Sequence, residues 1–245
     1  SRGLGDVYKR QIGYCADVAA GKVESEKNPI RFAVFLAFFG HGPSGPIVRY
    51  GQQAPQLDPS SETRRVSADR FCYGIKRLVL GLAKKAIIAD QMALIYAKVA
   101  AVPAATLPAP ILVLGYTAYM MQLYFDFSGY SDMAIGLGRM FGFHFRENFN
   151  YPYTATTIKE FWRRWLISLS GWFRDYLYIP LGGNRKGKAR TWLNRFLVFF
   201  ATGLWHGASW TFVLWGLWHG LFSVLEDCGA IPVDKLKGKR IGQLY

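Results

Sequence analysis

The chain has 245 residues and a net charge of +14; apolar residues make up 51% of it and aromatic residues 16%. Its three cysteines, Cys15, Cys72 and Cys228, are far apart and include no CxxC pair, which excludes a disulfide framework and a cysteine-ligated zinc site. The basic residues cluster beside apolar runs, as expected for loops next to a membrane, and this pattern argues against a nucleic-acid surface. We therefore expect an integral membrane protein with no nucleic-acid partner.

The sequence divides into three stretches by composition. Residues 1–29 form an N-terminal stretch of uncertain assignment, and residues 1–11 show no clear period, which leaves open whether they are native. Residues 30–226 carry the apolar runs and are expected to form the core, and residues 227–245 are a polar, basic tail. Because the chain begins with Ser1 rather than Met and breaks off after that tail, we expect it to be a fragment of a longer protein.

The first apolar segment, residues 32–39, is too short to cross a bilayer. It leads into a turn with Pro43 and Pro46 beside glycines, which favours a re-entrant or interfacial turn. His41 lies in this turn and is interpreted as a loop histidine. Residues 71–102 have a helical pattern with interleaved charges, which predicts either a tilted span or a helix lying against others.

Residues 111–125 form an uninterrupted apolar run, which predicts a second membrane span. Asp126 and Asp132 follow it directly. In one helix, six residues put these carboxylates about 240° apart around the axis, so we do not expect them to form a pair. They are interpreted either as helix-terminal caps and polar helix contacts or as the lining of a polar cavity.

Residues 157–178 have the clearest helical pattern in the chain. Thr157 and Glu160 have the spacing of a capping box, which predicts the first turn. Apolar side chains then recur every three or four residues, with three tryptophans on the stripe, as is typical of a basic amphipathic helix at a membrane interface. The basic loop that follows, residues 184–190, is expected to be cytoplasmic.

The longest apolar run, residues 196–225, contains no Asp, Glu, Lys or Arg and is the strongest candidate for a membrane span. It carries the pentapeptide Gly-Leu-Trp-His-Gly twice, around His206 and around His219. The glycines also match the GxxxG packing pattern of membrane helices. Trp205 is likewise open to interpretation as a packing or interface residue rather than a site residue. In one continuous helix the two histidines would lie about 20 Å apart along the axis and about 220° apart around it. They could then share no reacting atom, unless the helix breaks near residues 207–209.

Six motifs stand out along the chain: GPIVRY at 45–50, YFDFSGYSDMA at 124–134, FWRRW at 161–165, ISLS at 167–170, WFRDYLYIPLGGNR at 172–185 and LWHGASWTF at 204–212. With these motifs in this order, residues 30–225 resemble the membrane-bound O-acyltransferases, in particular the bacterial branch with alginate O-acetylation and teichoic acid D-alanyl transfer proteins. The resemblance implies an all-α fold: a polytopic integral membrane protein with re-entrant and interfacial amphipathic helices. It also implies a multi-pass location in the bacterial cytoplasmic (inner) membrane and a buried histidine near the middle of a tunnel.

The same resemblance implies an O-acyltransferase that moves acetyl or a similar small acyl group to a hydroxyl of an exported cell-surface polysaccharide. By resemblance, His206 is the general base; a buried, neutral imidazole suits the removal of a hydroxyl proton. The implied partners are the lipid bilayer, the polysaccharide or a periplasmic or extracellular acyl-accepting protein, and a donor, either acyl-CoA or an acyl carrier. No bound cofactor and no metal are expected, since HxxxH and HExxH are absent.

Further site residues are expected around the base. Candidate accessory residues are His219, Asp126, Asp132 and Trp205. Contacts with the substrate, a channel or lipid are expected from Arg163, Arg164, Trp165, Arg174, Asn184 and Arg185. No GxSxG sequence is present, which favours direct transfer over a covalent acyl-enzyme.

Leu166 departs from the family pattern, in which a histidine commonly follows the Arg-Arg-Trp sequence. The departure motivates an alternative function, a catalytically inactive or non-enzymatic export scaffold or transporter with the same fold.

Overall fold

The computed structural model describes residues 2–38, 45–58, 61, 64–207 and 209–233. These residues form helices and no strand, which confirms the predicted all-α class for the part described. They belong to two compact units, Ser1–Glu147 and Asn148–Tyr245. His41 and residues 234–245 of the predicted tail lie outside the described residues, and the predicted boundaries at 30 and 226 stay a prediction.

Helices follow one another along the described part of the first unit. They are α1 (Arg2–Ala19), α2 (Pro29–Ala37), α3 (Tyr50–Leu57), α4 (Ala68–Ala83), the π-helical η2 (Lys84–Ala89), α5 (Asp90–Ala100), the short η3 (Ala104–Thr106) and α6 (Ala109–Met140). Two helices begin where the sequence supplies an N-cap: the Asn28 side chain accepts from the backbone N–H of Ile30 at 2.9 Å, and Ser67 caps α4 in the same way.

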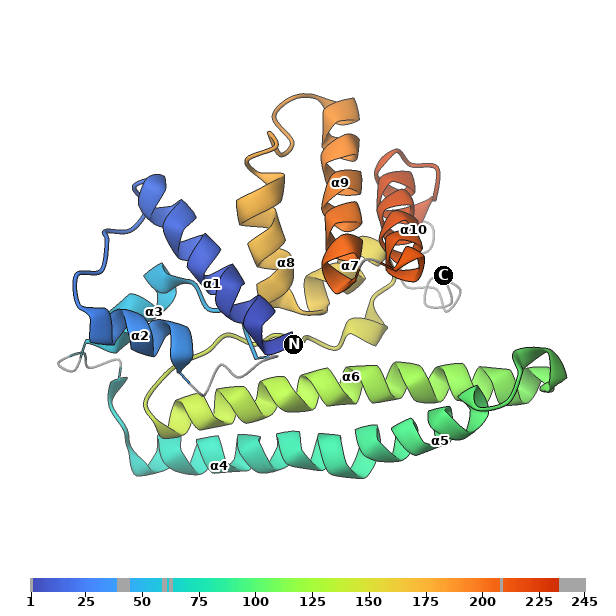
Figure 1. Ribbon diagram of the computed structural model, residues 1–245, viewed down its shortest axis with the longest axis horizontal. Coiled ribbons are helices and arrows are strands. Elements are labelled where there is room, and N and C mark those ends of the chain that lie inside the picture. The colour runs from blue at the N-terminus through green and yellow to red at the C-terminus, as the bar shows by residue number, and fades with distance from the viewer. Residues whose placement is uncertain (1, 39–44, 59–60, 62–63, 208, 234–245) are drawn as a thin grey trace. The chain divides into compact units, whose positions relative to one another are not determined.

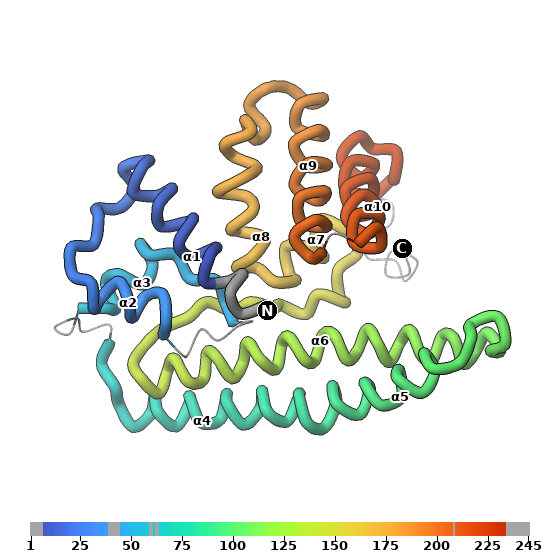
Figure 2. Tube along the Cα trace, in the orientation of Figure 1, coloured from blue at the N-terminus to red at the C-terminus, as the bar shows by residue number. Residues whose placement is uncertain are grey.

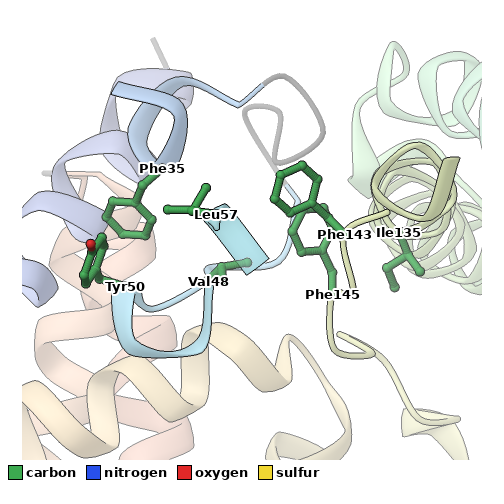
Figure 3. Close-up of a cluster of buried hydrophobic side chains, with 7 residues drawn as sticks. All are labelled: Phe35, Val48, Tyr50, Leu57, Ile135, Phe143 and Phe145. Atoms are coloured by element: carbon green, nitrogen blue, oxygen red, sulfur yellow. The ribbon is translucent and has the colours of Figure 1, made fainter. Parts of the chain in front are cut away.

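Aromatic side chains pack around the fully buried ring of Phe35 in the first unit, and Figure 3 shows Tyr50 beside it. The ring centroids of Tyr14, Phe32 and Tyr50 lie 6.4, 6.3 and 5.2 Å from it. Glu26 joins two of these residues: its carboxylate accepts from the Tyr50 hydroxyl at 2.5 Å, and its backbone N–H donates to Tyr14 at 2.8 Å. The buried members of the wider cluster are Phe35, Val48, Tyr50, Leu57, Ile135, Phe143 and Phe145.

Helices α4, η2 and α5 lie alongside α6 (Figure 1). Glycines make the close approach possible, since a Cβ on Gly81 would lie 2.4 Å from the carbonyl oxygen of Gly129. A Cβ on Gly136 would likewise lie 2.6 Å from the carbonyl oxygen of Gly74. Real Cβ atoms do not approach so closely, so both crossings require glycine.

The predicted helix at 71–102 is confirmed as α4, η2 and α5. The apolar run at 111–125 is only the first half of α6, which continues to Met140. Asp126 and Asp132 therefore lie inside a helix, and their interpretation as helix-terminal caps is wrong. The local pattern was misleading because small residues such as Ser128 and Gly129, which resemble a helix end in sequence, are buried against α4 instead.

Within the described residues, no helix is both long enough and apolar enough to cross a membrane. The spans predicted at 111–125 and 196–225 thus have no counterpart among these helices, and the second run is not one helix. The predicted re-entrant and interfacial helices stay a prediction.

The second unit is also helical where it is described. Its helices are the short η4 (Pro152–Thr154), α7 (Ile158–Arg164), α8 (Ile167–Phe173), the π-helical η5 (Arg174–Tyr178), α9 (Lys188–His206) and α10 (Trp210–Asp227). The Cα trace in Figure 2 shows α9 and α10 side by side, in agreement with the contacts between them.

Candidate active site

The first turn of α7 forms as the capping box predicts. Thr157 Oγ1 accepts from the backbone N–H of Glu160 at 3.0 Å, and the Glu160 carboxylate accepts from the N–H of Thr156 at 3.1 Å, one residue before the expected position. Arg164 Nη2 donates to the same carboxylate at 2.6 Å. The Thr156 bond first, and the Arg164 guanidinium with it, hold the pKa of Glu160 below its usual range.

The C-terminal end of α10 fixes the same turn. The buried carboxylate of Glu226 accepts from the backbone N–H groups of Ile158 at 2.5 Å and Lys159 at 3.2 Å. Lys159 Nζ in turn pairs with Asp227 at 2.5 Å. A carboxylate at a helix N-terminus is stabilised by the unpaired N–H groups and the helix dipole, so these bonds attach α7 firmly to α10.

The prediction of a single helix at 157–178 is wrong, because the helix is interrupted at Trp165 and Leu166. Leu166 has φ 42° and ψ 57°, in the left-handed region, which costs a leucine about 1–2 kcal/mol. Asn148, 1% exposed, holds the break: its carbonyl oxygen accepts from the N–H of Ile167 at 2.9 Å, and its Oδ1 accepts from the N–H of Ser168 at 3.1 Å. The residue that caps α8 therefore comes from a distant part of the sequence.

A loop joins η5 to α9, and Asn194 organises it. The buried amide of Asn194 donates to the carbonyl oxygens of Leu181 at 3.3 Å and Gly183 at 3.0 Å, and Arg190 Nε donates to its Oδ1 at 3.0 Å. The hydroxyl of Tyr178 also hydrogen-bonds to Asn184 in this loop. Gly182, Gly183 and Gly187 all have positive φ, which explains the glycine content of the loop.

The apolar run at 196–225 forms α9 and α10, with Gly207 ending the first helix and the Ser209 hydroxyl capping the second. The alternative of a break near 207–209 is thus confirmed. The two helices cross at Gly203 and Gly216: a Cβ on Gly203 would lie 2.5 Å from the carbonyl oxygen of Phe212. The packing role suggested for the GxxxG glycines is confirmed at these two positions.

The break brings the two histidines to one aromatic side chain. The ring centroid of Trp215 lies 5.2 Å from that of His206 and 4.9 Å from that of His219. Trp162 of α7 completes the group, with its ring centroid 5.2 Å from His219 and 5.6 Å from Trp215. Phe199 of α9 lies 5.6 Å from Trp162. We call these five residues the histidine–tryptophan cluster.

The environments of the two histidines differ from the sequence expectation. His206, expected to be buried, is exposed at the end of α9, where its ring lies 4.7 Å from Trp205 and 5.9 Å from Phe212. The reason is that α9 ends at His206, whereas a buried position assumed that the helix continued. His219 is half-buried, and its Nδ1 has no hydrogen-bond partner within the described residues.

A pocket of about 480 Å³ adjoins the cluster, and Trp162 and Phe199 belong to both. Four basic side chains line it: Lys159, Arg163, Arg174 and Arg195. The apolar lining residues are Trp162, Leu166, Ile167, Leu169, Phe173, Val198 and Phe199, and the hydroxyls are those of Ser170, Tyr178, Thr202 and Ser223. Such a mixture of cations and apolar wall suits an anionic molecule with an apolar part.

The basic side chains of the pocket are not equally engaged. Lys159 and Arg195 both form ion pairs with Asp227, and Arg174 Nε pairs with Asp175 at 2.7 Å. Arg163 is exposed and has no ion-pair partner within the described residues. It is therefore the cation of this pocket that is best placed to receive an anionic ligand.

The structure separates the residues predicted to contact substrate, channel or lipid. Arg163 and Arg174 line the pocket. Arg164 instead bonds to Glu160 and Thr154, and Trp165 is 7% exposed and packs on Phe149 and Phe161. Asn184 and Arg185 lie in the loop before α9 and are not among the pocket residues.

The two predicted accessory carboxylates lie in the first unit and bind different cations. Asp132 is 6% exposed, and its two oxygens pair with Arg77 and Lys84, each at 2.6 Å. Asp126 pairs with Lys85 at 2.9 Å. The expectation that they form no carboxylate pair is consistent with this arrangement.

Sequence reasoning missed Trp215, Asn148 and Lys159. Trp215 did not stand out from the other apolar residues of the run at 196–225. Its spacing of four from His219 is the signal that could have identified it, because residues four apart lie on the same helix face. Asn148 carried no signal, because its partners are twenty residues away. Within the described residues no three His, Cys, Asp or Glu side chains lie together as a metal ion would require.

The comparison with known proteins agrees with the motifs. Residues 22–228 match the model of the membrane-bound O-acyltransferase family, and the chain belongs to that family. It is 48% identical to a probable alginate O-acetylase of Pseudomonas syringae pv. tomato over 88% of this chain and 40% of the relative. It is 43% identical to a peptidoglycan O-acetyltransferase of Helicobacter pylori over 78% of this chain and 36% of the relative. A teichoic acid D-alanyltransferase of Bacillus subtilis is 33% identical over 81% of this chain and 51% of the relative.

The chain spans about 40% of the length of the alginate O-acetylases that it matches. The family match, residues 22–228, includes the histidine–tryptophan cluster and the residues that line the pocket.

Proposed function

We propose that this protein is a membrane-bound O-acyltransferase of the bacterial cytoplasmic membrane that moves acetyl, or a similar small acyl group, to hydroxyls of an exported polysaccharide. The single observation that carries the proposal is the contact of His206 and His219 with one tryptophan, beside a cationic, partly apolar pocket. The relatives named for O-acetyl transfer are 48% and 43% identical and the D-alanyltransferase 33%, which favours acetyl over D-alanyl.

His206 is proposed as the general base. Its imidazole takes the proton of the acceptor hydroxyl while that oxygen attacks the acyl carbonyl carbon. A C–O ester bond forms, the bond between the acyl carbon and the donor sulfur breaks, and the proton passes to the departing thiolate. The His206 ring is exposed at the end of α9, where an acceptor hydroxyl can reach it.

His219 is proposed as an accessory residue, with Trp205 and Trp215 orienting the reactive imidazole. His219 packs against Trp215 and against Trp162, a pocket residue. Its position supports a role in shaping the donor end of the site. The acidic residues Asp126 and Asp132 are proposed to hold the helices of the first unit together, since both are ion-paired.

The pocket is proposed to receive the acyl donor, an acyl-CoA or the prosthetic arm of an acyl carrier. Both donors combine phosphate groups with a thin apolar acyl chain. Arg163 and Arg174 suit the phosphates, because guanidinium groups bind them in a bidentate way. The apolar side chains around Trp162 suit the acyl group. No bound cofactor beyond this co-substrate is proposed.

The proposal is tested with His206→Gln in membranes from cells that produce the protein, by measuring ester-linked acetyl on the exported polymer. Loss of the base predicts a fall of about 10²–10⁴-fold in the transfer rate. His219→Gln is the matched control, since it changes the second copy of the same pentapeptide, and a loss below about tenfold is expected. Unchanged acetylation in His206→Gln at equal protein levels contradicts the assignment of the base.

A second function, an inactive export scaffold or transporter, is favoured by one residue. Leu166 stands in the pocket wall where the family commonly has histidine. Leu166→His separates the two functions: acetylation that appears only in this variant shows that the natural protein is inactive. Acetylation by the wild-type protein supports the enzyme.

A further inference from the structure

Leu166 adopts a backbone conformation that leucine disfavours. Of the residues the structure describes, only Tyr151 and Leu166 have positive φ without being glycine. Glycine or asparagine would adopt φ 42° at much lower cost. Strained residues of this kind persist where the surrounding structure enforces them, and they concentrate at ligand-binding positions.

The strain at Leu166 is enforced from two sides. After the break, Asn148 accepts hydrogen bonds from the backbone N–H groups of Ile167 and Ser168, and from the Ser168 hydroxyl at 2.8 Å. Before it, the N–H of Asn150 donates to the carbonyl oxygen of Arg164 at 2.9 Å. These bonds fix the backbone at position 166, and with it the direction of the Cα–Cβ bond, whichever side chain the residue carries.

That direction places Leu166 in the wall of the pocket. The exposed cation Arg163 and the apolar residues Ile167 and Leu169 line the same pocket. Asparagine or glycine would adopt this backbone conformation at lower cost, so the conformation by itself does not account for a leucine. The side chain itself is what distinguishes this residue in the pocket.

We propose that Leu166 is a specificity-determining residue that contacts the acyl group of the donor and restricts it to acetyl. This inference rests on the proposed function, because it assigns the pocket to the acyl donor. A leucine side chain fills space that a longer acyl chain would need. A difference of one methylene in an apolar pocket changes kcat/KM by about 10–200-fold, so a single side chain is enough to impose such a limit.

The test measures transfer from acetyl-, propionyl- and butyryl-CoA by membranes that contain wild-type protein, Leu166→Gly or Leu166→Asn. Leu166→Gly relieves the backbone strain and opens the wall, so the ratio of kcat/KM for butyryl to that for acetyl should rise about tenfold or more. Leu166→Asn relieves the strain with a side chain of similar size, and this ratio should stay within about threefold of wild type. Both variants should unfold at the same temperature as wild type or higher.

Tyr151→Gly is the matched control. Tyr151 has the other positive φ, at 46°, and it is exposed and does not line the pocket. Removing its strain should leave the acyl preference unchanged. An unchanged butyryl-to-acetyl ratio in a folded Leu166→Gly variant overturns the inference while leaving the proposed function intact. Absence of transfer from every donor in the wild-type protein overturns the proposed function and this inference together. Failure of both Leu166 variants to fold overturns the inference alone.

Discussion

His206 and His219 lie on different helices, and the indole of Trp215 is in contact with both imidazole rings. The ring planes of Trp215 and His206 are inclined at 82°, and those of Trp215 and His219 at 65°. Edge-to-face contacts of this kind are favourable and directional. Trp215 therefore couples the orientation of the two histidines, although thirteen residues separate them in sequence.

The coupling leads to a first prediction, for Trp215→Phe. Phenylalanine keeps an aromatic ring in α10 but is too small to contact both imidazoles, so His206 should lose its fixed orientation. We expect acetyl transfer to fall by about ten- to a hundredfold, because small displacements of a catalytic group have effects of this size. The measurement is polymer acetylation at matched protein levels. Trp218→Phe is the control, since Trp218 is exposed and packs on Phe222, and wild-type transfer in both variants would contradict the coupling.

A second prediction concerns the crossing of α9 and α10. Gly203→Ala would put a Cβ 2.5 Å from a backbone oxygen, which cannot move as a side chain can. We expect the free energy of unfolding to fall by about 1–3 kcal/mol, the usual cost of overpacking. Thermal unfolding of the detergent-purified protein measures it. Leu204→Ala, at an exposed neighbouring position, should change stability by less than about 0.5 kcal/mol. Equal effects of the two substitutions would argue against a tight crossing.

The carboxylates of α6 provide a third prediction. Asp132→Ala removes the carboxylate shared by Arg77 and Lys84, so Lys84 loses its ion pair with it and Arg77 keeps the one with Glu147. Because Arg77 and Lys84 are 22% and 33% exposed, we expect a loss of about 1–3 kcal/mol, the usual cost of leaving a polar partner unpaired. Asp126→Ala is the matched control on the same helix, because the Asp126 side chain is 42% exposed, and exposed pairs contribute about 0–1 kcal/mol. Chemical denaturation of the two variants should therefore give clearly different midpoints, and similar midpoints would count against a buried network.

A fourth prediction concerns acid stability and Glu26. The hydrogen bond from the Tyr50 hydroxyl, followed by the Asn28 backbone N–H, lowers the pKa of Glu26 in the folded protein. The unfolded chain then binds the proton more readily, so this stabilisation is complete above the unfolded pKa of 4.5 and is lost as the pH falls through the lowered value. Wild-type protein should lose more stability between pH 6 and about pH 3 than Glu26→Gln does.

Unfolding midpoints across this pH range measure the difference. Glu24→Gln is the control, because it removes the same charge from an exposed side chain two positions before Glu26. A pH dependence that is the same in wild type, Glu26→Gln and Glu24→Gln would show that the Tyr50 hydrogen bond does not stabilise the folded state.

The sequence by itself determined the features that depend on neighbouring residues. The capping box at Thr157 and Glu160 and the helical character of 71–102 both depend on residues within one or two helical turns of each other. The family motifs also identified the family to which the chain belongs. These signals are local, so they can be read from residue types and spacing alone.

Only the tertiary structure decided where the helices break. The run at 196–225 gave an uninterrupted apolar pattern, yet α9 ends at His206 and a new helix begins at Trp210. The helix predicted at 157–178 breaks at Leu166, because Asn148 supplies a cap from outside the segment. Hydrogen bonds and ring contacts between distant residues outweigh helix propensity, which contributes less than about 1 kcal/mol per residue. For that reason the meeting of His206 and His219 at Trp215 could not be read from their spacing along the chain.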